Sequence, residues 1–178
     1  MSCRGRAILV AALAATGAAA PTSAEVIARF VEGAPTDRFV IRNEGPCAIG
    51  PSVIVIDLTT AAGGLIFDTT SAGAGVQVFQ PFDVAEGAEM LRGASTVTDG
   101  DQRIELTVTG LAPGDPLAFT IDVDDTQVRG PLGQTQIAGA EIEGATLTVT
   151  GLDAGRVDTG AFDEEGFASV ATSACPTS

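Results

Sequence analysis

In the stretch at residues 117–125, LAFTIDVDD, large apolar residues alternate strictly with small or polar ones up to Asp124, and Asp125 follows. The apolar members are Leu117, Phe119, Ile121 and Val123. A period of two residues is typical of a β-strand that buries one face. We therefore predict a central strand with its apolar side chains in the core. Its other face would carry the carboxylates of Asp122 and Asp124.

Short stretches of the same kind recur along the chain between turns rich in Gly and Pro. We predict further strands at residues 25–32, 38–43, 52–59, 65–68, 76–79, 89–92, 95–98, 103–109, 134–143, 145–150 and 167–171. Beyond the first 24 residues, no stretch shows a sustained helical period. The pattern predicts an all-β protein, a single antiparallel immunoglobulin-like β-sandwich. The residues expected to face the central strand across its core are Ile54, Ile56, Leu106 and Val108.

The first 24 residues have the composition of a signal peptide. Arg4 and Arg6 precede an apolar run at residues 7–15, and small residues follow up to Ala24, where we predict cleavage. The apolar run is too short for a spanning helix, and we expect no membrane span in the rest of the chain. The mature protein is therefore predicted to be exported to the periplasm, the cell surface or the medium.

Two cysteines, Cys47 and Cys175, remain after this processing. An even number of cysteines in an exported chain implies a disulfide bond between them. We expect the bond to tie an acidic, Gly-rich tail at residues 152–178 back to a sandwich domain at residues 25–151.

The composition also restricts the possible functions. The formal net charge is −14, which disfavours nucleic acid and anionic lipid as partners and favours cations or basic partners. Trp and Tyr are absent, which argues against a carbohydrate-binding surface. His is absent too, so the usual catalytic triad has no base. We therefore predict that the protein is not an enzyme.

An acidic end of the domain is predicted from the connection between two strands. If residues 110–116 join strands 103–109 and 117–124, the far ends of these strands lie at one pole, whether the strands pair or occupy opposite sheets. The carboxylates expected to converge there are Asp99, Asp101, Asp122, Asp124 and Asp125. A Ca²⁺ ion with six to eight oxygen ligands would relieve their repulsion. The alternative is that loops spread these side chains into water, where salt screens them.

Residues 106–123, LTVTGLAPGDPLAFTIDV, resemble the corner between the fifth and sixth strands of fibronectin type III and related immunoglobulin-like domains. Leu111, Pro113 and Gly114 stand at the Leu-x-Pro-Gly positions of that corner. Leu117 replaces its usual Tyr and lacks the hydroxyl that would be buried there. The resemblance implies a sandwich topology and no particular activity.

A second resemblance extends over residues 31–47, 63–82 and 119–126. These segments are similar to exported bacterial proteins named aggregation factor core proteins. The resemblance implies calcium-dependent adhesion at the cell surface. We therefore expect a binding or adhesion function at or outside the cell envelope, with a protein or cell-surface partner. The alternatives are a soluble periplasmic accessory protein that binds another protein and, third, a small hydrolase.

Overall fold

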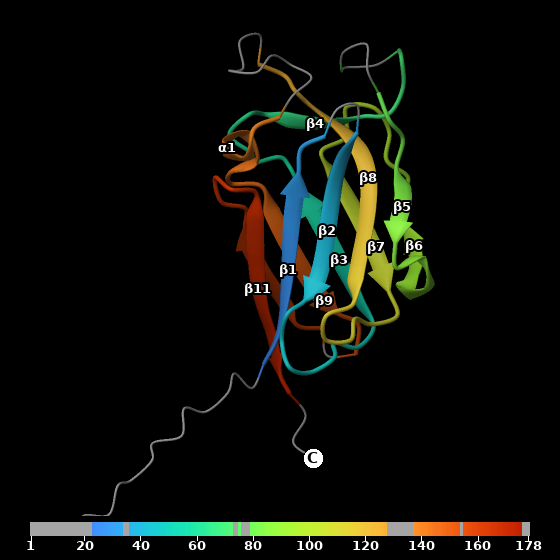
Figure 1. The fold of residues 1–178 in the computed structure, drawn as a ribbon, viewed down its shortest axis with the longest axis vertical. Helices are drawn as coiled ribbons and strands as arrows, with labels where there is room; N and C mark the ends of the chain where they lie inside the picture. Colours follow the sequence, from blue (N-terminus) through green and yellow to red (C-terminus); the bar gives the residue numbers. More distant parts are fainter. Residues whose placement is uncertain are drawn as a thin grey trace, which may run out of the picture.

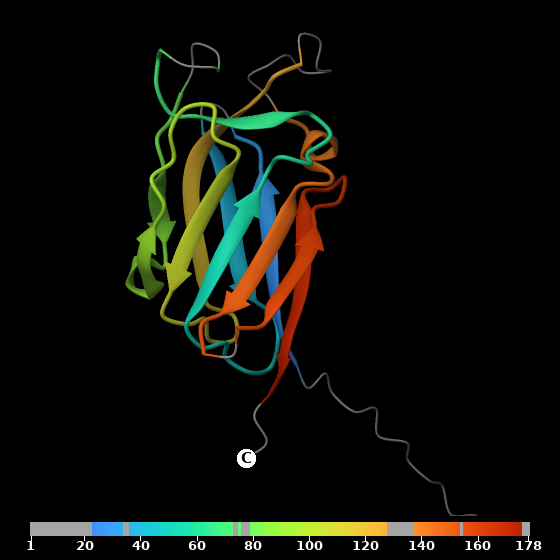
Figure 2. The ribbon, with the colours of Figure 1, turned by 180° about the vertical axis from the view of Figure 1, so that it is seen from behind.

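Two antiparallel sheets pack face to face in the computed structural model (Figures 1 and 2). The structure describes residues 23–33, 36–72, 75, 79–127, 137–153 and 155–175. The predicted all-β sandwich is confirmed.

The first sheet is six-stranded. Its order is β11 (Phe167–Ala174), β1 (Ser23–Val31), β2 (Asp37–Asn43), β8 (Pro116–Asp125) and β4 (Leu65–Asp68), and β5 (Asp83–Glu86) also pairs with β8. The second sheet is five-stranded and runs β10 (Val157–Ala161), β9 (Thr146–Gly151), β3 (Ser52–Asp57), β7 (Arg103–Val108) and β6 (Leu91–Ala94). Two short helices, η1 (Ala88–Met90) and α1 (Gly139–Ile142), lie in connections.

The core lies between the sheets and contains the alternating residues of the central strand. Phe119, Ile121 and Val123 of β8 are fully buried, and the Phe119 ring stacks on Phe39 with 5.2 Å between centroids. Across the core the predicted partners are buried in turn, namely Ile54, Ile56, Leu106 and Val108. The apolar face of β8 lies in the core as the sequence predicted. Its other face is also buried at Ala118, Asp122 and Asp124, so the strand does not bury one face alone.

The connection from β7 to β8 crosses from one sheet to the other. Leu111 in this connection is 1% exposed and forms an isolated bridge with Ile49. Because β7 and β8 lie in opposite sheets, the end of β8 and the start of β7 reach the same pole of the domain. This is the second of the two arrangements that the sequence left open.

Some predicted elements differ from the structure. Residues 139–142, expected in a strand, form α1, whose start is capped because Glu141 Oε2 accepts a hydrogen bond from the Ala138 backbone N–H at 2.7 Å. Gly144, with a φ of 88°, follows this helix in the left-handed conformation that commonly ends helices. Residues 95–98 form no strand; the pairing with β7 is made by β6 instead. The predicted strand at residues 76–79 lies mostly outside the described residues.

The first and last strands of the described chain pair with each other. β11 is antiparallel to β1, and Ala168 and Val170 are each 2% exposed. β10 extends the second sheet beside β9. Residues 157–174 are thus part of the sandwich rather than a tail beyond it. The predicted signal peptide lies outside the described residues except for Ser23 and Ala24, which begin β1.

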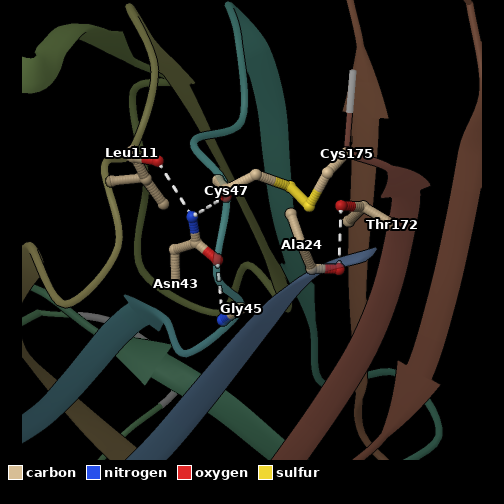
Figure 3. The surroundings of a disulfide bond; sticks show 7 residues. All are labelled: Ala24, Asn43, Gly45, Cys47, Leu111, Thr172 and Cys175. Carbon is tan, nitrogen blue, oxygen red and sulfur yellow. Dashed lines mark hydrogen bonds between the residues drawn. A yellow bond between two sulfur atoms is a disulfide. The ribbon is translucent and has the colours of Figure 1, made fainter. Parts of the chain in front are cut away.

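A disulfide joins Cys47 to Cys175 at the end of the domain where β11 finishes, with 5.6 Å between their Cα atoms (Figure 3). The predicted pairing is confirmed. Beside it the buried Asn43 side chain donates hydrogen bonds to the carbonyls of Cys47 and Leu111 and accepts one from the Gly45 N–H. Among the described helices, none is long and apolar enough to cross a membrane.

Candidate metal centre

Three aspartates meet where β4 pairs with the end of β8. Asp122 and Asp124 are two residues apart on β8, so their side chains lie on the same face. In the antiparallel register between the strands, Asp68 of β4 stands opposite Asp122. One carboxylate oxygen from each residue lies within 4.8 Å of the others. We call Asp68, Asp122 and Asp124 the carboxylate cluster.

The carboxylate cluster is shielded from solvent. Asp68, Asp122 and Asp124 are 0%, 4% and 1% exposed. The backbone of Gly75 passes directly over it, and a Cβ at that position would overlap the carboxylates of Asp68 and Asp124. Only glycine therefore allows the backbone to approach this closely.

The buried oxygens lack the donors that a carboxylate needs. Neither oxygen of Asp68, nor Oδ2 of Asp122, accepts a hydrogen bond from a donor in the described part of the chain. The neighbours of Asp68 are instead other carboxylates, Asp99 and Asp124. An ionised carboxylate buried in this way loses its hydration without compensation, which costs several kcal/mol. The arrangement therefore requires protons or a cation.

The acid–base properties follow from this environment. Burial, followed by the proximity of Asp99 and Asp124, raises the pKa of Asp68 from its usual value near 4 to about 7. Burial, and then the charges of Asp124, Asp37 and Asp68, also raise the pKa of Asp122 to about 7. Without a cation, these groups thus tend to hold protons at a pH where exposed aspartates are ionised.

A fourth buried acid, Asp37, stands beside the cluster at the start of β2. Its carboxylate accepts hydrogen bonds from the backbone N–H groups of Gly33 at 3.1 Å and Val123 at 3.0 Å. These bonds favour the ionised form, but burial outweighs them and raises the pKa of Asp37 to about 7. Asp37 therefore adds to the charge repulsion at this pole and also anchors β2 to β8.

Of the five predicted ligands, Asp122 and Asp124 belong to the cluster and Asp99 lies beside it. The Asp99 carboxylate accepts hydrogen bonds from the backbone N–H groups of Thr69 at 3.1 Å and Thr70 at 3.4 Å, immediately after β4. It is also close enough to Asp68 to raise the pKa of that residue. Asp99 thus connects the turn before β7 to the cluster.

The other two predicted ligands make separate contacts. Asp101 Oδ2 accepts hydrogen bonds from the Thr98 N–H and hydroxyl, each at 2.7 Å, and so closes its own turn. Asp125 Oδ1 accepts one from the Gln127 N–H at 2.8 Å, and the alternation of β8 places its side chain opposite that of Asp124. The structure does not bring Asp101 or Asp125 into the cluster.

Asp68 and Asp37 are the members of this pole that sequence reasoning missed. Asp68 ends the predicted strand LIFD, and all four residues of that strand are buried. The signal that could have identified Asp68 is a carboxylate placed directly after three apolar residues of a strand. Asp37 lies one residue before the strand predicted at residues 38–43, so it was not considered as part of a strand.

The ligand set has a definite chemical preference. Three carboxylates, with Asp99 beside them, are hard oxygen ligands of the kind that Ca²⁺ takes six to eight at a time. No described Cys or His belongs to the cluster, so its donors are poorly suited to Zn²⁺ or Cu⁺. Mg²⁺ prefers to keep several water molecules, for which a buried group of carboxylates offers little room.

Compared with models of known protein families and with curated proteins, the sequence matches none of them. The function is therefore inferred from the carboxylate cluster and its chemistry.

Proposed function

We propose that this chain is an exported β-sandwich domain that functions in binding or adhesion at or outside the cell envelope and is stabilised by one Ca²⁺ ion. The carboxylate cluster would hold the ion. The observation that carries the proposal is Asp68, which is completely buried between Asp122 and Asp124 with no hydrogen-bond donor in the described residues for either of its oxygens.

The energetic cost of buried charge favours a bound cation over a cluster of ionised carboxylates without one. A buried carboxylate without donors is costly, and two like charges close by increase that cost. Protonation removes the problem only below the raised pKa values of about 7. A divalent cation removes it at higher pH because it compensates the charge and is coordinated by the bare oxygens.

The position of the cluster explains how an ion would stabilise the fold. The cluster joins β4 to β8 in the first sheet, and Asp99 belongs to the turn that leads into β7 of the second sheet. An ion there would connect both sheets at one end of the domain, as the disulfide connects the loop after β2 to the end of β11 at the other. This fits a module that works outside the cell, where calcium-binding domains typically have Kd values of about 10⁻⁴–10⁻³ M.

Calorimetric titration of the chelator-treated protein with CaCl₂ at pH 7.5 tests the proposal. We expect one Ca²⁺ per chain, and no measurable uptake by the double variant Asp68→Asn/Asp122→Asn. Asp101→Asn is the matched control, because Asp101 is an acid of the same pole whose carboxylate hydrogen-bonds only within its own turn in the described contacts. Absence of uptake by the unmodified protein, or equal loss in the control, would overturn the proposal.

A further inference from the structure

The outer face of the first sheet carries an open groove on β1, β2 and β11. Strand register places Ile27 beside Arg42, and Arg29 between Val40 and Phe167. Figure 1 views this sheet from outside, and no described element crosses in front of β1 and β2. The residues that line the groove include Ile27, Arg29, Val40, Arg42, Glu44 and Phe167. We call it the arginine groove.

The arginine groove combines apolar surface with positive charge. The Phe167 side chain is 39% exposed, and the Arg29 guanidinium lies over its ring at 5.1 Å from the centroid. This cation–π contact favours one position of Arg29, and the residue remains exposed. Ile27 and Val40 are half-buried. In the register of β1 and β2, Ile27 lies beside Arg42 and Val40 beside Arg29.

The charge of the groove contrasts with that of the whole chain. The formal net charge is −14 with 9 basic residues in total, two of which line this groove. The described ion pairs use Arg38, Arg103 and Arg156, so neither Arg29 nor Arg42 is neutralised by a described carboxylate within salt-bridge distance. Glu44, which also lines the groove, offsets the charge only in part.

We infer that the arginine groove binds an extended acidic segment of a partner protein, in which carboxylates alternate with apolar side chains. Guanidinium groups pair with carboxylates through two parallel N–H···O bonds. The alternation of Arg and apolar residues across the groove matches an extended segment, in which every second side chain points the same way. A nucleic acid or an anionic membrane would extend beyond the groove and meet the acidic surface around it, whereas a short segment contacts the groove alone.

A fluorescein-labelled peptide of alternating aspartate and valine, titrated by fluorescence anisotropy in calcium-containing buffer, tests this inference. Binding should weaken as salt is raised. The double variant Arg29→Gln/Arg42→Gln should lose about tenfold or more in affinity, since each arginine contributes a charge-assisted pair. Arg103→Gln is the matched control, because Arg103 is an exposed arginine on the other sheet.

Two further peptides separate the contribution of charge from that of apolar contact. A peptide of alternating lysine and valine, and one of alternating aspartate and serine, should bind much more weakly. Absence of binding by the unmodified protein, equal loss in Arg103→Gln, or equal binding of the serine peptide would overturn the inference. A second copy of the chain as the occupant would appear as a dimer in sedimentation that the double variant dissociates, and this too would overturn it. The groove is separate from the carboxylate cluster, so peptide affinity should be the same in calcium and in chelator, and failure of the calcium proposal would leave this inference standing.

Discussion

A buried polar side chain lies near each end of this sandwich, and their surroundings are opposite in kind. Asn43, at the disulfide end, is 0% exposed, and its amide donates two hydrogen bonds and accepts one (Figure 3). Asp68, at the other end, is also 0% exposed, yet no described donor reaches either of its oxygens. The same degree of burial is accompanied by complete hydrogen bonding in one case and by none in the other.

The difference separates a structural role from a ligand-binding one. A neutral amide with all its partners supplied by the chain stabilises a loop and needs nothing further. A carboxylate without donors, surrounded by other carboxylates, destabilises the fold unless a proton or a cation is added. The disulfide end should therefore be indifferent to pH and calcium, whereas the acidic end should respond to both.

The largest expected effect is at the disulfide end. Replacing Cys47 and Cys175 by serine should lower the free energy of unfolding by about 2–5 kcal/mol, because the bond closes a loop with a sequence separation of 128 residues. Urea unfolding measures the loss. It should be the same in calcium and in chelator, since the bond is remote from the carboxylate cluster. A loss that calcium largely removes would show that the two ends are coupled.

A smaller loss is expected from Asn43→Ala, which leaves the carbonyls of Cys47 and Leu111 without that donor. The free energy of unfolding should fall by about 1–3 kcal/mol, independently of calcium. Thr172→Ala is the control, since the half-buried Thr172 hydroxyl makes one weaker bond of 3.2 Å to the Ala24 carbonyl. If both variants lose equally little in urea unfolding, the Asn43 network is not what stabilises this end.

At the acidic end the expected change is smaller and has the opposite sign. In chelator at pH 7.5, Asp122→Asn should raise the free energy of unfolding by about 1–2 kcal/mol, because it removes a buried charge and adds amide donors beside Asp68. In calcium the same variant should be less stable than the unmodified protein. Asp158→Asn on the second sheet serves as the control for a general charge effect. If Asp122→Asn instead destabilises the protein in chelator as much as Asn43→Ala does, the side chains at both ends have a structural role.

Sequence alone predicted the strands whose pattern is local. β2, β3, β4, β7, β8 and β9 were placed within about two residues of their observed bounds, because each alternates or is mostly apolar over its own length. β10 was missed, since its sequence VDTGA has no apolar alternation and it forms through pairing with β9. A strand was predicted where α1 forms. The helical turn is favoured by the cap at Ala138 and by Gly144 in the left-handed conformation after it.

The candidate site, like the strands, could be predicted only where it depends on a local sequence pattern. Asp122 and Asp124 were found because their proximity depends only on the alternation of one strand. Asp68 was missed because its position opposite Asp122 depends on the register between β4 and β8. Asp99 and Asp101 look alike in sequence, and only the turn geometry directs Asp101 to Thr98 and leaves Asp99 beside Asp68.

The pH dependence of stability follows from the raised pKa values. Asp37, Asp68 and Asp122 have pKa values of about 7 in the folded protein and near 4 when unfolded. Between those values the folded state holds more protons than the unfolded state, so without a cation the stability falls as pH rises from about 4 to about 7. A bound cation favours the ionised carboxylates and so opposes that fall.

Thermal unfolding at pH 5 and pH 7.5, each in calcium and in chelator at low salt, tests the central claim most directly. At pH 7.5, saturating calcium should raise the Tm by about 5–10 °C, as expected for an ion present at about 100 times its Kd. At pH 5, where protons occupy Asp68 and Asp122, the calcium effect should be much smaller. Identical Tm values in calcium and chelator at pH 7.5 would contradict the account. The charge of the cluster would then be neutralised by protons and not by calcium.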